Sequence, residues 1–483
     1  MKSKIYIFLI AISLISCDSF LDETPENFIT PQGFFKNEQQ LNEAVNAVYN
    51  TNRNLMNDAQ WRFGENRSDN SSFQYNPGDR GGIPNEELDL FLMVAANPNI
   101  AAYWNTAYSG ISRANFALEN LDKVAFLNEN NREIRRGEVL FLRSWFYFNL
   151  AQLYGDVPLV LSAGDSPEEI LGSEFRERTP VAQVYNQIMG DMSKAIDLLP
   201  NKGATDAGRA TKGAAIMLKA KMHMALKEFP AARDLLVQMQ GYSLQTVYAK
   251  VFDPSNKNNS ESVFEIQYSF AIGQGSDFVS RFVPFNSKSV ILGANGPAGS
   301  RAGQNQPTQD LINLYNPTDK RFLHNISFYN DGVTREPWMS KFNYGFVAQG
   351  NNTQNVNFPM FRYADALLML AECYNEAGGG DPVALLQQVR TRALTNPALS
   401  PAESANLSQT IADERRRELA FENHRWFDLV RTGKAVAVMT AHGIQQKAQK
   451  TTVPAQAYTN IRTLLAIPQG QLEEFGFKQT PGW

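Results

Sequence analysis

Residues 414–433 read ERRRELAFENHRWFDLVRTG, and this stretch decides how the chain is expected to fold. Its acidic residues Glu414, Glu418 and Glu422 recur at every fourth position, so a helix places them on one face, about one turn apart. The pattern predicts a helix over residues 411–430. Three arginines at 415–417 alternate with these carboxylates, and we expect the charges to pair inside a packed scaffold.

Carboxylates one helical turn apart have about the separation of a retaining glycosidase pair. Such enzymes, however, hold their two carboxylates on opposite sides of the sugar, whereas neighbours on one helix point the same way. Catalysis by Glu414, Glu418 and Glu422 is therefore not expected.

Helical apolar spacing extends from this block over most of the chain. The first helix is expected to begin near Asn37, and helical spacing follows in residues 111–121 and 139–153. Further helices are predicted over residues 181–199, 211–226, 363–377 and 382–393, most of them bounded by Gly or Pro. The fold class is therefore mainly α.

Two long segments lack this periodicity. Residues 57–99 are rich in Gly, Asn, Asp, Ser and Pro, and a second segment of mixed character lies between Met239 and Tyr363, with a strand-like stretch at 262–268. Irregular segments of this length are uncommon in compact domains unless they have a functional role. We expect a binding surface there.

The N-terminus has the layout of an export signal. Lys2 and Lys4 precede an apolar run from Ile5 to Ile15, which is shorter than the roughly 20 residues of a membrane-spanning helix. The run ends in Leu-Ile-Ser before Cys17, which resembles the lipobox of bacterial lipoproteins. We predict a signal peptide at residues 1–16, lipidation of Cys17 and an extended tether over residues 17–36; the alternative is an ordinary signal with a cysteine nearby by chance.

Composition narrows the class of partner. Lys and Arg number 45 against 49 Asp and Glu, without basic runs, which argues against nucleic acid as a partner. With Cys17 lipidated, Cys373 is the only remaining thiol, so no disulfide is expected. The membrane would be contacted through the lipid anchor alone.

No cofactor or metal site is expected from motifs. Gly208 and Gly213 have the glycine spacing of a phosphate-binding loop, but alanines occupy the positions of its Lys and Ser or Thr. The four histidines are scattered without metal-ligand spacing, and there is no GxSxG nucleophile motif. The sequence therefore predicts a protein that is not an enzyme.

Several separated blocks, taken in order, resemble one family. The most specific is the stretch at 414–433, with His424 where the family often has Gly, and the chain closes on QTPGW, where Thr480 replaces a frequent Asn. The other blocks are CDSFLD at 17–22, Trp104 with Tyr108, Ile111 and Asn115, residues 138–147, YGDVP at 154–158, GRAT at 208–211 and RYADALLMLAE at 362–372. By this set the chain resembles the SusD/RagB-like outer-membrane nutrient-binding lipoproteins of Bacteroidetes-type bacteria.

This resemblance implies degenerate TPR-type helix pairs that form a superhelix, with long irregular and short-strand insertions. It implies a single domain over residues 37–483, with an N-terminal part at about 37–240 and a C-terminal part at about 260–483. The protein would face the cell exterior on the outer membrane, with a SusC-like TonB-dependent β-barrel transporter as its partner.

The same resemblance implies non-catalytic binding of an oligosaccharide or polysaccharide and its delivery to the transporter. Capture of peptides with the same partner is the alternative. Two further hypotheses remain open from the residues alone, a surface-anchored glycosidase and an adaptor that binds only protein.

A glycan platform needs flat aromatic side chains against the CH faces of sugars and polar groups at their edges. Because the family's insertions vary, no binding residue is carried over by motif. We predict ligand contacts from the irregular segments, although each aromatic could instead fill the core beneath its loop. The candidates are Trp61, Arg67, Asp69, Asn70 and Tyr75 in the first segment, and Trp338 and Tyr344 in the second.

Overall fold

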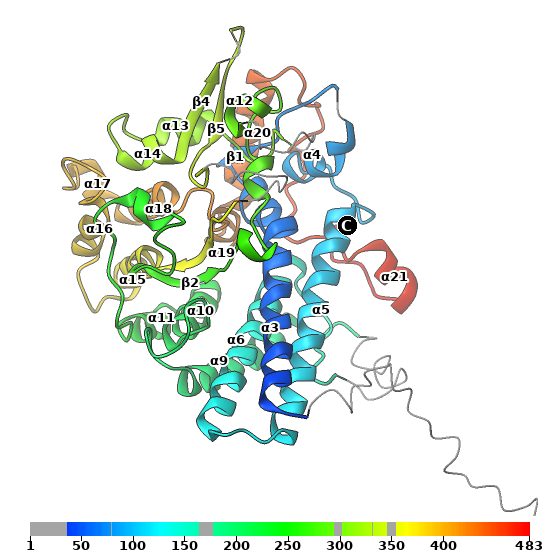
Figure 1. Cartoon of the computed structure of the whole chain (residues 1–483). Coiled ribbons are helices and arrows are strands. Elements are labelled where there is room, and N and C mark those ends of the chain that lie inside the picture. Colours follow the sequence, from blue (N-terminus) through cyan, green and yellow to red (C-terminus); the bar gives the residue numbers. More distant parts are fainter. Residues whose placement is uncertain (1–35, 79, 164–176, 294–301, 331, 345–353) are drawn as a thin grey trace, which may run out of the picture.

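The computed structural model describes residues 36–483 apart from residues 79, 164–176, 294–301, 331 and 345–353 (Figure 1). The predicted signal peptide, the lipidation site Cys17 and all of the predicted tether except residue 36 lie outside the described residues. Among the residues that are described, no helix is both long and apolar enough to cross a membrane.

Long helices from the first half of the chain form the scaffold. Figure 1 shows them side by side, coloured from blue to cyan: α3 (Glu38–Leu55), α5 (Pro98–Asn120), α6 (Glu129–Tyr154) and α9 (Val181–Leu198). The first begins where the sequence predicts, because the Asn37 side chain accepts the N–H of Gln40 at 3.0 Å. Its stripe of Leu41, Val45 and Val48 is fully buried against the neighbouring helices.

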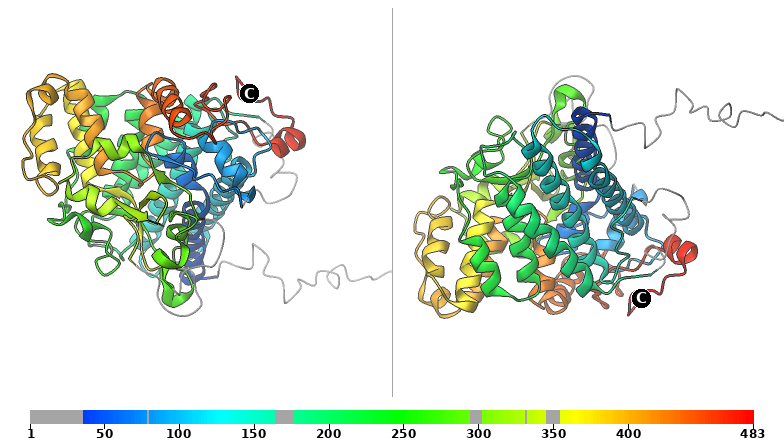
Figure 2. Two further views of the ribbon diagram at one scale, coloured as in Figure 1. Left: turned by 90° about the horizontal axis from the view of Figure 1, so that it is seen from above. Right: turned by 90° about the horizontal axis from the view of Figure 1, so that it is seen from below.

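Helices from the rest of the chain extend this scaffold by pairwise packing. Helix α9 packs on α10, α10 on α11, α11 on α15, and α15 on both α16 and α18, which gives the successive helix pairs of a TPR-like arrangement. Helices α16 and α17 lie at the side opposite to α21 and the C-terminus (Figures 1 and 2). Their bounds are α10 (Lys212–Ala225), α11 (Phe229–Leu236), α15 (Tyr363–Ala377), α16 (Pro382–Arg390), α17 (Pro401–Ala405), α18 (Leu407–Glu418), α19 (Arg425–Arg431), α20 (Ala435–Gln449) and α21 (Gln469–Phe475).

Short strands and helices make up the insertions. Antiparallel pairs join β1 (Ser71–Ser72) to β3 (Gln306–Pro307), β2 (Ser262–Ile266) to β6 (Phe358–Arg362), and β4 (Ile326–Asn330) to β5 (Arg335–Met339). The strand predicted at 262–268 is therefore confirmed. The remaining α-helices of the described residues are α4 (Ile83–Asp89), α12 (Lys288–Leu292), α13 (Gln309–Leu314) and α14 (Lys320–Asn325), and short 3-10 turns lie between them.

The first irregular segment is more helical than predicted. Two π-helical turns, Met56–Gln60 and Arg62–Asn66, prolong α3, and α4 lies in the predicted loop. Trp61 joins the two turns, and its side chain lies in the core. The helix therefore continues through a segment whose sequence shows no helical apolar spacing. The prediction of an irregular segment over 57–99 is wrong for these parts.

The helix predicted over 411–430 is broken in the structure. Helix α18 ends at Glu418 and α19 begins at Arg425, and between them Phe421 and Asn423 adopt positive φ angles of 66° and 67°. The cause is distant in sequence: the Glu65 carboxylate accepts the backbone N–H groups of Phe421 at 2.9 Å and Asn423 at 3.1 Å. A Cβ at Gly64 would lie 2.5 Å from the Asn423 carbonyl oxygen, so only glycine allows this approach.

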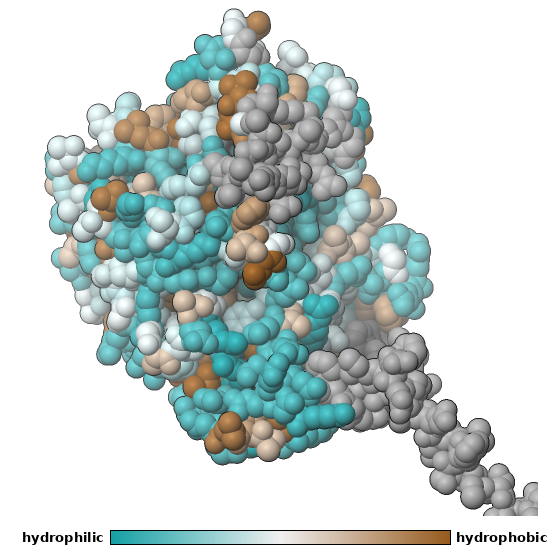
Figure 3. Space-filling view, in the orientation of Figure 1, coloured by the Kyte–Doolittle hydropathy of each residue, from teal (hydrophilic) through white to brown (hydrophobic). Residues whose placement is uncertain are grey.

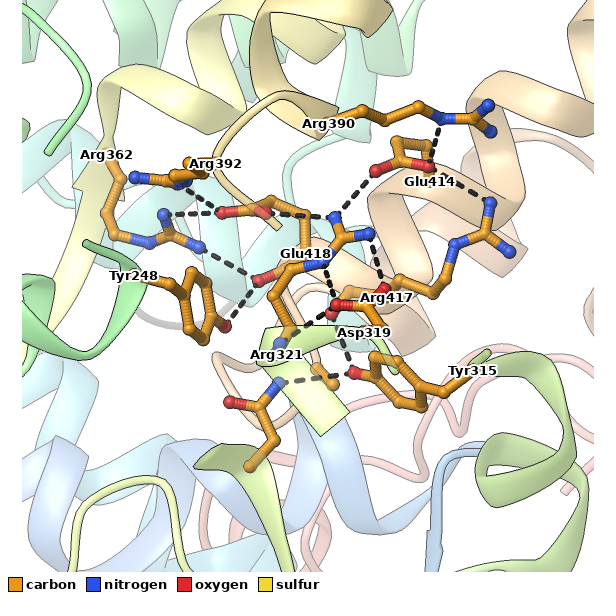
Figure 4. A network of polar contacts seen from close by, with 12 residues as sticks. Tyr248, Tyr315, Asp319, Arg321, Arg362, Arg390, Arg392, Glu414, Arg417 and Glu418 are labelled. Carbon is orange, nitrogen blue, oxygen red and sulfur yellow. Dashed lines mark hydrogen bonds and ion pairs between the residues drawn. The ribbon is translucent and has the colours of Figure 1, made fainter. Parts of the chain in front are cut away.

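The acidic face of α18 is confirmed as part of a buried ion network (Figure 4). Glu418 pairs with Arg321 at 3.1 Å, with Arg362 at 3.0 Å and with Arg392 at 2.6 Å. Glu414 pairs with Arg321 at 2.6 Å. Burial alone would raise the pKa of Glu418, but the charges of Arg392, Arg362 and Arg321 hold this pKa at about 2.

Glu418→Gln should therefore destabilise the fold strongly. The amide keeps the shape but removes the charge that three buried arginines share, and an unbalanced buried charge costs about 3–5 kcal/mol. The free energy of unfolding, measured by urea denaturation, should fall by that amount. Asp413→Asn, on the same helix, is the control, because its carboxylate accepts one exposed hydrogen bond from Gln409; equal losses in the two variants would contradict the account.

Candidate ligand-binding cleft

A cleft of about 630 Å³ lies near α4, α20 and the β4–β5 hairpin, elements that Figure 1 shows in the upper part of the molecule. Its walls come from segments far apart in the chain, at residues 72–75, 80–90, 285–286, 306–309, 334–337 and 446–458. This size is typical of small-molecule sites in proteins.

One wall of the cleft carries Tyr75, which is 41% exposed. The guanidinium of Arg80 lies 4.6 Å from the centre of its ring, a cation–π contact. Arg80 is itself held by Glu86 through two parallel bonds of 2.8 and 3.0 Å. The three side chains fix a flat aromatic surface at the edge of the cleft.

Charged groups also lie at the base of the cleft. The Asp89 carboxylate accepts the N–H of Phe73 at 2.8 Å and the hydroxyl of Tyr458 at 3.3 Å. Lys450 donates to the Ser72 hydroxyl at 2.9 Å. These bonds join α4, the chain after β1 and the segment after α20 at one point.

Burial shifts both titrating groups toward their neutral forms. It raises the pKa of Asp89 to about 7, and the Phe73 N–H and Lys450 only partly oppose this shift. Burial likewise lowers the pKa of Lys450, against the opposing attraction of Asp89 and Glu336.

Neutral polar side chains supply most of the remaining polar lining. Gln74 accepts the N–H of Phe285 at 3.0 Å, and Gln306 donates to the Phe282 carbonyl at 2.8 Å. Further amides and hydroxyls come from Thr308, Gln309, Gln446, Gln449 and Thr452. An aromatic surface beside amides and hydroxyls, each able to donate or accept, suits a ligand with weakly apolar faces and many hydroxyl groups.

Tyr75 is the one predicted contact residue that lines this cleft. Trp61, by contrast, is 1% exposed and packs edge-on against Phe282 at 5.2 Å. Arg67 is fully buried, with its guanidinium 4.3 Å from the Trp426 ring and 5.1 Å from the Phe91 ring. The expectation that these two side chains lie at the surface is wrong, because the π-helical prolongation of α3 turns this segment inward.

Asp69 and Asn70 are also buried, contrary to the same expectation, and they hold the loop from beneath. Arg425 bonds the Asp69 carboxylate at 2.7 Å, and Arg416 donates to the Asn70 side chain at 2.7 Å. Thr308 of the cleft donates its N–H to the Asn70 carbonyl at 3.0 Å. These residues position the cleft rather than line it.

The two candidates from the second irregular segment do not line the cleft. Trp338 is 7% exposed and packs with Val283, Leu292 and Ala302. Tyr344 is half-buried, and its hydroxyl donates to the Ala249 carbonyl at 2.8 Å.

Sequence reasoning missed the part of the cleft formed after α20. Gln446, Lys450 and Tyr458 lie more than 350 residues from Tyr75 in the chain, and no motif marks them. Within the described ranges, no group of three or more His, Cys, Asp or Glu side chains is placed to hold a metal ion.

The fold and the cleft define a mainly helical protein with a cleft lined mostly by its insertions. Comparison with known proteins gives the family. The model described as "SusD family" matches residues 323–483, and the model described as "Starch-binding associating with outer membrane" matches residues 19–224. The chain belongs to the SusD/RagB family.

Individual relatives agree with this assignment. SusD-like protein P25 of Formosa agariphila is 27% identical over 479 residues, with 89% of each chain covered. A laminarin-binding SusD-like protein of known structure has a TM-score of 0.75 at 25% identity and covers 93% of this chain and 100% of its own. Surface glycan-binding protein A from Bacteroides thetaiotaomicron, in complex with laminarihexaose, shares the fold with a TM-score of 0.70 at 21% identity, over 92% of this chain and 100% of its own.

The raised pKa of Asp89 gives a pH test of the base of the cleft. Its pKa is about 7 in the fold against 3.8 ordinarily, so the folded state favours the protonated carboxyl and loses stability as the pH rises through this window. Asp89→Asn stays neutral. Its free energy of unfolding, relative to the wild type, should rise by about 2–3 kcal/mol from about pH 5 to pH 8.

Denaturation at a series of pH values measures this difference. Asp206→Asn is the matched control, because the side chain of Asp206 is 87% exposed. A difference between wild type and Asp89→Asn that does not change with pH would show that Asp89 titrates normally.

Proposed function

We propose that this protein binds an oligosaccharide or polysaccharide without cleaving it, and that the cleft around Tyr75 is the binding site. The observation that carries the proposal is the half-exposed Tyr75 ring, fixed by Arg80 beside a lining of amides and hydroxyls. A sugar ring stacks its CH face on such an aromatic, and amides at its edges bond the hydroxyls.

The comparisons support a glycan as the ligand class. One matching family model is described as starch-binding, and a structural relative at 25% identity is a laminarin-binding protein. A curated relative, 22% identical over 65% of this chain and 67% of its own, is the starch-binding protein SusD of Bacteroides thetaiotaomicron. These ligands are those of the relatives, and binding measurements with a panel of glycans would identify the sugar that this chain binds.

The carboxylates of the cleft favour binding over hydrolysis. Glu86 uses both oxygens on Arg80, and Asp89 is buried with two donors. A glycosidase needs one carboxyl group poised as an acid and a second free to act as base or nucleophile on the scissile bond. Neither Glu86 nor Asp89 is available in this way, and Glu336, the third carboxylate of the described lining, is a single group where a glycosidase needs two.

The main test is the substitution of the aromatic platform. Tyr75→Ala should weaken binding of the purified full-length chain to its glycan about ten-fold or more, a loss of about 1.4 kcal/mol, because the stacking surface is removed. Affinity electrophoresis and calorimetry against a glycan panel that includes laminarin and starch would measure it.

Two further variants make the result specific. Tyr75→Phe keeps the ring and should retain most of the affinity, whereas Tyr374→Ala removes a tyrosine of α15, outside the cleft, and should change nothing. Glycan binding that survives in Tyr75→Ala would place the site elsewhere. Binding of peptides but no glycan would favour the alternative ligand class.

We also propose that the protein is anchored in the outer membrane by lipid at Cys17, faces the exterior and delivers its ligand to a SusC-like TonB-dependent transporter. The leader pattern before Cys17 supports the anchor, and the family description supports the membrane. The transporter follows from family resemblance; stoichiometric co-purification with a TonB-dependent barrel from solubilised outer membranes would test it.

Replacing Cys17 should release the protein from the membrane. Cys17→Ser removes the thiol that carries the acyl chains, so the protein should move from the membrane fraction to the soluble fraction and lose labelling by radioactive palmitate. Cys373→Ser is the control, because that thiol is buried and should not affect the anchor. Membrane retention and labelling of Cys17→Ser would refute lipidation at this position.

A further inference from the structure

The charges that line the cleft point to a class of glycan. The described lining contains the basic side chains Arg80 and Lys450 and the acidic side chains Glu86, Asp89 and Glu336. Proteins that bind carboxylate or sulfate groups usually present a cation, most often an arginine fork, that is free to pair with the ligand. The question is whether either cation here is free.

Arg80 is already paired. Its two terminal nitrogens bond the two oxygens of Glu86 at 2.8 and 3.0 Å, and its guanidinium plane lies over Tyr75 at 4.6 Å. An anionic ligand could recruit Arg80 only by breaking a bidentate ion pair and disturbing the aromatic platform.

Lys450 already has acidic neighbours in the cleft. Its ammonium group donates to the Ser72 hydroxyl at 2.9 Å, and the carboxylates of Asp89 and Glu336 attract its charge. Lys450 is therefore already attracted by two carboxylates of the cleft, and an incoming anion would have to compete with both of them.

Glu336 is a carboxylate of the cleft that has no ion pair among the described residues, and Lys450 is a cationic neighbour at longer range. Glu336 lies on β5, half-buried, and no Lys or Arg of the described residues comes within ion-pair distance of its carboxylate. A carboxylate or sulfate group on the ligand would meet this negative charge in a partly desolvated site, where charges are screened less than in water.

We propose that the cleft selects electrically neutral saccharides over those that carry uronate or sulfate groups, and that Glu336 enforces the selection by repulsion. The neutral donors and acceptors of the lining can bond hydroxyl groups, and each described cation of the lining already faces carboxylates of the cleft, Glu86 for Arg80 and both Asp89 and Glu336 for Lys450. This inference rests on the proposed function, since it concerns the ligand of the same cleft.

The first experiment is a binding panel with the full-length chain at low ionic strength. The neutral probes are laminarin, starch, xyloglucan and galactomannan, and the anionic probes are alginate, polygalacturonate and carrageenan. We expect the tightest binder to be neutral. An anionic polymer as the tightest binder would overturn this inference while leaving the proposed function intact, and binding to no glycan would overturn both.

The second experiment assigns the selection to Glu336. The best neutral glycan is compared with a carboxymethylated preparation of the same polymer, which should bind at least ten-fold more weakly, with the gap narrowing as salt is added. Glu336→Gln should recover several-fold of the loss for the charged polymer, so that the ratio between the affinities for the neutral and the charged polymer becomes smaller.

The matched control is Glu474→Gln, which replaces an exposed glutamate of α21 outside the described lining of the cleft and should alter neither affinity. If Glu336→Gln changes the affinities for the two polymers equally, or changes neither, then repulsion by Glu336 is refuted. Because Glu336 forms no ion pair in the described part of the chain, its replacement is not expected to impair folding.

Discussion

The ion network around Glu418 is the constraint on which the rest of the structure depends. Removing a charge from water costs several kcal/mol per ion, so each member of a buried network is tolerated only when its partners are in place. Arg362 is the last residue of β6, Arg321 lies on α14, and Arg392 follows α16. All three form ion pairs with Glu418 of α18. The network therefore ties together segments that have little periodicity of their own.

The cleft is also held by ion pairs, which come from α18 and α19. Arg416 on α18 and Arg425 on α19 fix the buried pair Asp69 and Asn70, just before the chain reaches Tyr75. Glu65, from the same segment, accepts backbone N–H groups in the connection between α18 and α19. The loop that presents the aromatic platform is thus anchored at its base, so ligand binding need not order it first, which reduces the entropic cost of binding.

The division of roles within the cleft follows from burial. At the base of the cleft, Asp89 and Lys450 are hydrogen-bonded and shifted toward their neutral forms, and they fix the geometry. Amides, hydroxyls, the Tyr75 ring and the carboxylate of Glu336 provide much of the remaining lining. The face shown in Figure 3 is mostly hydrophilic, with scattered hydrophobic areas. A surface of this kind suits a hydroxyl-rich ligand better than an apolar one.

The sequence by itself determined the mainly helical class, the bounds of most helices, the family and the pairing of the acidic face at 414–422, because these depend on periodicity and local motifs. It also singled out Tyr75, which the structure places in the lining of the cleft. Only the tertiary structure decided that Trp61, Arg67, Asp69 and Asn70 are buried and that the helix after Glu418 is broken. Those outcomes depend on contacts between residues some 350 positions apart, such as Glu65 with Phe421, and a local pattern carries no information about which distant segment will pack against it.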